Sequence, residues 1–163
     1  YKMALNLLLT QRGIPQLYYG SEILMKNYKN PSDAEVRKDF PGGWTGDAVN
    51  KFTAAGRTAQ ENEAFDYVKA LAGFRKTSSA IGSGKLMQYL PKDGVYTYFR
   101  FDKKQTVMVI SNTGNNPFRP DWNYLAERTA GFTKLRNVIT GAVSPMRDFE
   151  IRAKESFVFE LLK

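Results

Sequence analysis

Hydrophobic and polar positions change their spacing about halfway along the chain. Up to residue 76, apolar side chains recur at helical spacing or form short continuous runs, whereas from residue 86 onward they alternate with polar ones. A period near 3.6 is typical of helices, and a period of two is typical of half-buried strands. The sequence therefore predicts an α+β chain with two parts, a mainly helical one over residues 1–84 and an all-β one over residues 85–163.

The first part reads as the end of an αβ unit. Residues 3–9 are apolar almost all round and predict a buried helix that stops at Gly13. Residues 14–19 follow as a short strand, with Pro15 near its start, where a missing N–H is tolerated. A helix, a glycine and then a strand favour a parallel sheet. The other strands of such a sheet are not found in this sequence, so we expect a piece of a longer protein.

A long loop and a second helix complete this part. Residues 20–56 exceed the usual connection length and contain aromatic side chains and a Pro41-Gly42-Gly43 turn, which favours a functional loop over a disordered one. Thr58 and Glu61 then have the spacing of a capping box. The apolar positions that follow predict a helix ending near residue 76.

The second part predicts short antiparallel strands. Residues 86–90, 95–101 and 106–111 alternate and are joined by good hairpin turns, and further candidates are residues 135–139, 149–153 and 157–162. The pattern over residues 113–132 is irregular and predicts no secondary structure. At least six strands at this spacing indicate a β-sandwich or barrel that begins near Leu86.

Composition narrows the chemistry. The chain has neither cysteine nor histidine. Catalysis by a thiol or a histidine and a zinc ribbon are therefore excluded within it. Its net charge is +8, but the basic clusters are small, which favours a solvated basic surface over nucleic-acid binding. No apolar run is long enough for a membrane-spanning helix. No dense cluster of oxygen ligands is present, so we expect no metal or cofactor.

Two motifs then point to a family. Residues 13–22 read G-I-P-Q-L-Y-Y-G-S-E and resemble the G-x-P-x-x-Y-Y-G-x-E stretch of the α-amylase family, glycoside hydrolase family 13. Residues 37–44 read R-K-D-F-P-G-G-W and resemble the R-x-x-F-P-G-G-W element of its cyclomaltodextrinase and neopullulanase group, particularly its Bacteroidetes members. Residues 85–100 and 138–141 are similar to the C-terminal domain of that group.

The resemblance implies a fold and an activity. Residues 1–84 would be the end of a catalytic (β/α)₈ barrel, with helix 7, strand 8, a long loop and helix 8, followed by an antiparallel β-sandwich over residues 85–163. The whole enzyme would be a retaining glycosidase for maltooligosaccharides, cyclodextrins or pullulan, and a periplasmic or other extracytoplasmic location is favoured. Its catalytic carboxylates would precede Tyr1, so this chain alone is expected to be inactive. Its orphan strand favours self-association.

The resemblance also implies substrate-binding residues. Asp33 and Arg37 match a pair that reaches sugar hydroxyls, which a carboxylate and a guanidinium can bind together. The alternative is an exposed ion pair between them. Phe40 and Trp44 are candidates for stacking on sugar rings or, alternatively, for pinning the loop in place.

Supporting roles and alternative functions remain open. Tyr19 and Glu22 are expected to shape the site rather than to catalyse, and no residue of the chain is assigned a catalytic role. The strand aromatics, from Tyr89 to Phe101, are either core or a surface sugar platform. The alternative functions are a non-catalytic carbohydrate-binding or interaction module and a nucleic-acid-binding β-barrel. The two motifs favour the enzyme because neither belongs in an isolated β-module.

Overall fold

The computed structural model describes all residues from 1 to 163, which group into two compact units. One unit comprises residues 1–15 and 70–163, and the other comprises residues 16–69. Helix α2 (Ala59–Thr77) crosses this division, so its first turns belong to the second unit and its last turns to the first. No helix is long and apolar enough to cross a membrane.

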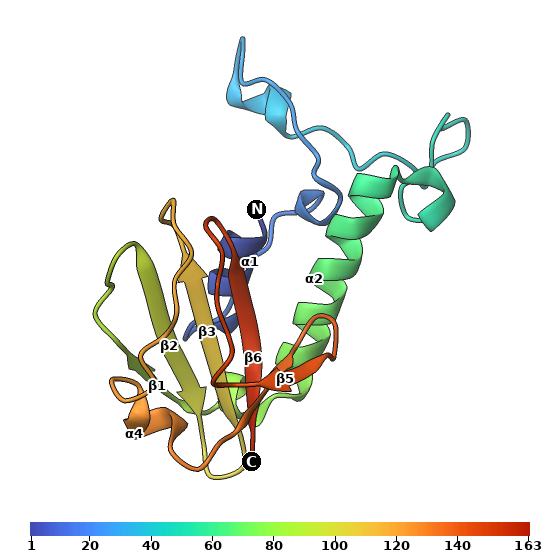
Figure 1. Cartoon of the computed structure of the whole chain (residues 1–163). Helices are drawn as coiled ribbons and strands as arrows, with labels where there is room; N and C mark the ends of the chain where they lie inside the picture. The colour runs from blue at the N-terminus through green and yellow to red at the C-terminus, as the bar shows by residue number, and fades with distance from the viewer. The chain divides into compact units, whose positions relative to one another are not determined.

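The first unit is built on one antiparallel sheet of six strands (Figure 1). Their order is β1-β2-β3-β6-β4-β5. The strands are β1 (Lys85–Gln88), β2 (Val95–Phe101), β3 (Thr106–Asn112), β4 (Lys134–Asn137), β5 (Val143–Pro145) and β6 (Ser156–Leu162). The prediction of at least six antiparallel strands beginning near residue 86 is therefore confirmed.

The sheet departs from the predicted sandwich in two respects. All six strands join one sheet, and its second layer consists of residues 113–132, with the short helix α4 (Ala126–Thr129), together with the chain before β6. The strand predicted over residues 149–153 is wrong, since only an isolated bridge joins Phe118 and Ile151 there. The short strand β5 was not foreseen. The arrangement is sandwich-like, with loops in place of a second sheet.

The strand predicted over residues 14–19 is absent from this chain. Ile14 is 98% exposed and lies in irregular backbone. A parallel strand gains its hydrogen bonds only from neighbouring strands, and this sequence supplies none beside it. The local β pattern therefore does not produce a strand.

One face of the sheet carries the main hydrophobic core. Alternate residues of the central strands point into it, as the period of two requires. Phe99, Met108, Ile110, Leu135 and Phe159 are all buried there. Among the strand aromatics, Tyr89 and Phe99 lie in this core and Tyr98 is buried on the other face, so the core interpretation is confirmed for these three.

Helix α1 (Lys2–Thr10) covers the opposite face, against β3 and β6 (Figure 1). This helix contains two buried polar residues, Asn6 and Thr10. Asn6 donates a hydrogen bond of 2.9 Å from Nδ2 to Ser156 Oγ, and Thr10 Oγ1 is hydrogen-bonded to the Tyr98 hydroxyl. Burial raises the pKa of Tyr98 to about 12, so this hydroxyl stays protonated. Buried polar groups that pair in this way fix a single arrangement of helix and sheet.

Two arginines hold the carboxyl end of α1. Arg100 is 2% exposed and donates to the carbonyls of Thr10 (2.9 Å), Ile81 (2.7 Å) and Gly84 (3.1 Å). From α2, Arg75 donates to the carbonyls of Leu9 and Gly13, each at 2.8 Å. The last carbonyls of a helix have no partner within it and carry partial negative charge, so they favour cations. Burial lowers the pKa of Arg100, and the charge of Arg75 lowers it further.

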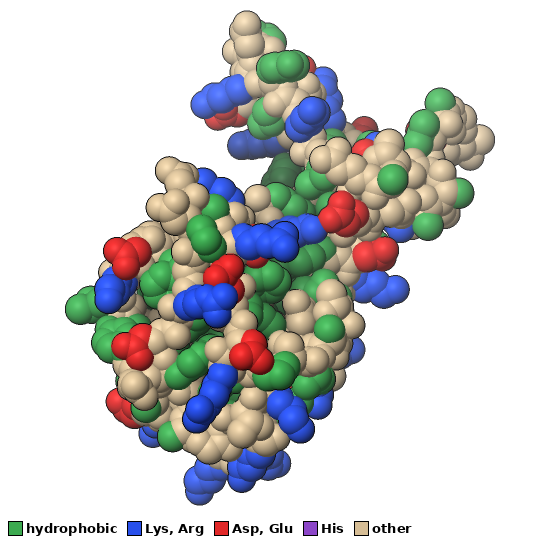
Figure 2. Space-filling view, viewed as in Figure 1, with side chains coloured by type: hydrophobic (Ala, Val, Ile, Leu, Met, Phe, Trp, Pro, Cys, Tyr) green, Lys and Arg blue, Asp and Glu red, His purple; other side chains and the backbone are tan.

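Charged side chains of both signs are dispersed over the face of the molecule seen in Figure 2. The ion pairs on this unit are partly exposed: Arg119 with Glu150 at 2.9 Å, Arg136 with Glu160 at 3.0 Å, and Arg128 with Glu127 at 3.6 Å. Exposed pairs of this kind contribute about 0–1 kcal/mol. The stability of the unit therefore depends on the buried contacts rather than on these pairs.

Replacing Arg100 tests this dependence. We expect Arg100→Met to lower the free energy of unfolding by about 3 kcal/mol or more, because three buried carbonyls lose their donor. Urea unfolding followed by tryptophan fluorescence measures the change. Arg136→Met is the matched control and should change stability by about 0.5 kcal/mol or less. Equal effects of the two variants would contradict the structural role of Arg100.

Candidate functional site

The sequence-predicted site residues all lie in the second unit, residues 16–69. Its chain is mostly irregular and contains three short 3₁₀ helices: η1 (Ser21–Ile23), η2 (Asp33–Val36) and η3 (Ala54–Gly56). A left-handed turn at Gly20 (φ 81°) starts η1. A β-carbon there would lie 2.7 Å from Met25 Sδ, so the motif needs glycine at this position.

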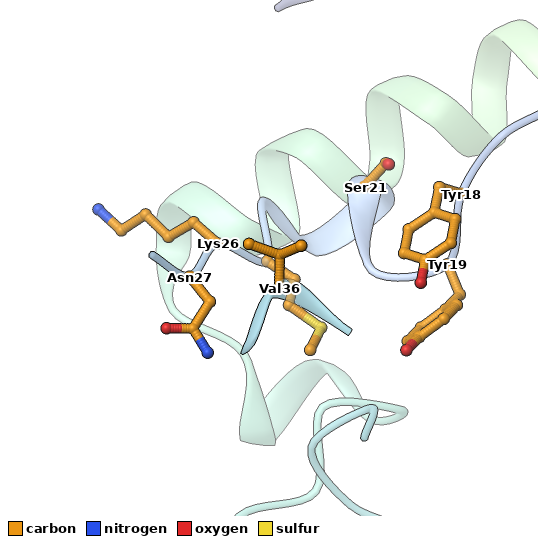
Figure 3. A pocket seen from close by; sticks show the side chains of 7 residues that line it. Tyr18, Tyr19, Ser21, Lys26, Asn27 and Val36 are labelled. Carbon is orange, nitrogen blue, oxygen red and sulfur yellow. The ribbon is translucent and has the colours of Figure 1, made fainter. Parts of the chain in front are cut away.

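Tyr19 lies beside a hollow of about 240 Å³ (Figure 3). Tyr18 and Tyr19 line one side of it, with ring centroids 4.6 Å apart, and Lys26, Asn27 and Val36 lie across from them. The Tyr19 hydroxyl donates a hydrogen bond of 2.9 Å to the Lys38 carbonyl.

Several groups act on the Tyr19 hydroxyl. Its pKa is raised, first by hydrogen bonding with Tyr18, then by desolvation and the charge of Asp39, against the lowering effect of Arg37. Tyr19 therefore lies close to the segment that carries Arg37, because its hydroxyl is hydrogen-bonded to Lys38, the residue after Arg37.

Asp33 and Arg37 stand at the two ends of η2. Asp33 forms an ion pair of 2.9 Å with Lys29, not with Arg37, and both partners are largely exposed. The ion pair considered from the sequence alone is thus made with a different residue. Arg37 is also exposed, so both side chains remain accessible to a ligand.

The glycines of the F-P-G-G-W motif allow a tight loop. Gly42 has φ 112°, and a β-carbon on it would lie 2.6 Å from Asn50 Cα. Lys51 N donates to Pro41 O at 2.9 Å and closes the loop. A larger residue at position 42 would separate these segments.

The two aromatic residues of this motif have different surroundings. Phe40 stacks on Phe52 with centroids 4.4 Å apart and is half-buried. Trp44 is 76% exposed, and its backbone N–H is held by Asp47 Oδ2 at 2.9 Å. The Phe40 ring therefore packs within the loop, whereas the Trp44 ring projects from it with its faces available.

The start of α2 anchors this loop. The predicted capping box is confirmed: Thr58 N donates to Glu61 Oε2 at 2.9 Å, and Glu61 N donates to Thr58 Oγ1 at 3.2 Å. Lys51 also pairs with Glu61. Arg57 donates to Asn62 Oδ1 at 2.8 Å and lies over the Phe65 ring, 4.0 Å from its centroid. Sequence reasoning missed Arg57 and Asn62, although both lie next to the capping box that it found.

Glu22 lines a second hollow, of about 410 Å³. Leu17 and Tyr19 share this hollow with Phe65, Val68 and Lys69 of α2. Tyr19 thus borders both hollows, which links the two support residues predicted from the sequence. None of the four predicted substrate-binding residues, Asp33, Arg37, Phe40 and Trp44, lines either hollow.

The exposed side chains of the loop are of types that can bind a ligand. An exposed carboxylate, a guanidinium and a projecting indole can contact a neutral, hydroxyl-rich ligand. No three acidic side chains group closely enough to hold a metal ion.

Comparison with known proteins gives the class. Residues 86–160 match the family model described as the cyclo-malto-dextrinase C-terminal domain. A cyclomaltodextrin glucanotransferase of Bacillus sp. (strain 1-1) is 27% identical over 98% of this chain, and that of Klebsiella oxytoca is 31% identical over 65%. An Anoxybacillus α-amylase structure is 20% identical, with a TM-score of 0.69 over 99% of this chain and 32% of its own.

These matches confirm the resemblance found in the sequence. The chain is related to the C-terminal portion of enzymes of the α-amylase family, glycoside hydrolase family 13, and residues 86–160 resemble a cyclo-malto-dextrinase C-terminal domain. The chain spans 21% of the length of the Bacillus relative and 15% of that of the Klebsiella relative.

The capping box supports a prediction on pH. Hydrogen bonds from Lys51 and then from the Thr58 amide lower the pKa of Glu61 in the folded protein. The ionised Glu61 therefore stabilises the folded state at pH values above the pKa that Glu61 has in the unfolded chain. This stabilisation is lost as the pH falls through the lower pKa of the folded state. We expect Glu61→Ala to destabilise α2 by about 1 kcal/mol at neutral pH and by less near pH 3. Thermal unfolding followed by circular dichroism at the two pH values measures this.

A matched variant separates charge from hydrogen bonding at this cap. Glu61→Gln keeps the acceptor for Thr58 N but removes the charge facing Lys51. It should therefore lie between the wild type and Glu61→Ala at neutral pH. A Glu61→Ala effect that is the same at both pH values would show that the charge has no role.

Proposed function

We propose that this chain is the C-terminal part of an enzyme that hydrolyses α-glucans with retention, of the cyclomaltodextrinase or neopullulanase type. Its substrates would be maltooligosaccharides, cyclodextrins or pullulan. The observation that carries the proposal is the likeness to the Bacillus cyclomaltodextrin glucanotransferase, which extends over 98% of this chain and so includes both the loop and the β-domain.

Under this proposal, residues 1–84 complete a (β/α)₈ barrel and residues 85–163 form the domain that follows it. The fold likeness to the Anoxybacillus α-amylase supports this, because it covers 99% of the chain. Exposed apolar side chains at Ile14, Leu17 and Tyr18 also support it, since neighbouring barrel strands would cover them. In the isolated chain the same residues favour self-association.

The loop then contributes to substrate binding. Asp33 accepts and Arg37 donates hydrogen bonds to sugar hydroxyls, and the exposed Trp44 ring stacks on a sugar face. Phe40 fixes the loop through Phe52. Tyr19 and Glu22 shape the two hollows. The catalytic carboxylates belong to the part of the enzyme that precedes Tyr1.

Substitution of the charged pair in the full-length enzyme tests the binding role. We expect Asp33→Ala and Arg37→Ala each to raise KM for maltotriose by roughly tenfold or more, because each removes a charged hydrogen-bonding partner. Steady-state kinetics on maltotriose measures this. Asp66→Ala, at another exposed carboxylate, on α2, is the control and should leave KM unchanged. KM and kcat that do not change in either variant would remove the pair from the site.

Because the proposal assigns the catalytic carboxylates to the part of the enzyme before Tyr1, it predicts that this chain is inactive alone. The purified 163-residue protein should release no reducing sugar from starch or cyclodextrin, whereas the full-length enzyme should do so. A reducing-sugar assay with both proteins at equal molar concentration makes the comparison. Release of maltose by the isolated chain, in a preparation free of host amylase, would overturn this part of the proposal.

A further inference from the structure

A cavity of about 670 Å³ lies in the β-domain, outside the loop described above. It opens between the chain around α4 and the turn that follows β5. We call it the α4 groove, and the residues used below are Trp122, Asn123, Gly131, Phe132, Arg147 and Asp148. Its volume is within the range of about 300–1,000 Å³ typical of small-ligand sites.

The walls of the α4 groove are held by the sheet and the core. Met146 N donates to Thr133 O at 2.9 Å, and Thr133 N donates to Leu162 O at 2.9 Å, so both walls are tied to β6. Trp122 and Phe132 are half-buried and pack against the main core. A groove fixed in this way loses little conformational freedom when a ligand binds.

Bare backbone forms part of the lining. Gly131 has φ 86°, and a β-carbon built there would meet nothing within 4 Å. The wall of the groove is therefore open at this position. A flat ring could approach the Trp122 and Phe132 side of the groove without obstruction from position 131.

Three polar side chains at the groove have no partner within the chain. Asn123, Arg147 and Asp148 are exposed, and none of their side chains takes part in a hydrogen bond or an ion pair. Arg119 and Arg136 on the same domain are, by contrast, paired with glutamates. The free groups are an amide that donates and accepts, a guanidinium that donates, and a carboxylate that accepts.

This combination selects one kind of ligand. The charges of Arg147 and Asp148 cancel, so neither an anion nor a cation gains net attraction. A purely apolar ligand would cover polar groups without pairing them, which costs free energy. A neutral ring with several hydroxyls satisfies donors and acceptors at once and offers an apolar face to the indole of Trp122.

We propose that the α4 groove is a second carbohydrate site that binds a segment of α-1,4-glucan. The choice of a glucan among neutral sugars rests on the proposed function, whereas the choice of a neutral sugar rests on the groove itself. Bound there, the polymer would be held on the β-domain at a place separate from the loop of residues 20–56.

Nuclear magnetic resonance on the isolated 163-residue chain tests the site without any need for hydrolysis. Titration with maltotriose should shift the Trp122 indole N–H and the Gly131 and Thr133 amides, with a dissociation constant on the order of 1 mM. Asp148→Ala should weaken binding roughly tenfold and Asn123→Ala roughly threefold. Both side chains are exposed, so these variants should fold.

Matched controls and a second sugar make the outcome decisive. Asp66→Ala and Asn115→Ala change exposed residues of the same types elsewhere and should leave the dissociation constant unchanged. Cellotriose should bind at least fivefold more weakly than maltotriose. Equal binding of the two sugars would overturn the glucan assignment. The site would be overturned if maltotriose caused no shift at these residues, or if the control and groove variants lost affinity equally. Neither result bears on hydrolysis by the full-length enzyme.

Discussion

The buried guanidinium of Arg100 is the interaction on which the first unit depends. It lies on a strand of the sheet and donates to carbonyls from the end of α1, from the short helix α3 (Ser79–Gly82) and from the residue before β1. A buried charge without a carboxylate partner is costly unless dipoles surround it, and the carboxyl end of a helix supplies such dipoles. Because the Nη1 and Nη2 donors are paired by three separate segments, the loss of any one segment would remove a hydrogen bond from the buried charge. Residues from before position 15 and after position 78 are thus held as one folded unit.

Local patterns in the sequence predicted the parts of the fold that depend on neighbours in the chain. Strands β2, β3 and β6 follow from their alternation, and the start of α2 follows from the Thr58 and Glu61 pair. Predictions failed where the outcome depends on distant partners. Residues 14–19 have a strand-like pattern but no neighbouring strand, and around Ile151 the chain makes one bridge instead of a ladder. A sequence pattern indicates that a segment can form a strand, and the presence of a neighbouring strand decides whether the strand forms.

The candidate site shows the same division. The resemblance pointed to Asp33, Arg37 and Trp44, and the structure leaves all three exposed. It could not show that Asp33 pairs with Lys29, because that contact depends on the conformation of the loop. Nor could it show why the motif contains Gly42, which follows from the close approach of Asn50. The groove residues were missed because Trp122 and Asp148 come from separate segments, which meet through the hydrogen bond between Met146 and Thr133.

The two units hold their exposed polar side chains in different ways. The unit of residues 16–69 holds its shape through short-range contacts, such as the Phe40–Phe52 ring contact and the hydrogen bonds of Arg57, so the exposed side chains of its loop can change without loss of a core. The α4 groove instead rests on a hydrophobic core that also holds the sheet together, which restricts Trp122 and Phe132 but leaves Asn123, Arg147 and Asp148 free to vary. Substitutions at these exposed loop positions are therefore expected to cost little stability. In the groove, only the polar rim has that freedom, because the aromatic walls pack against the core.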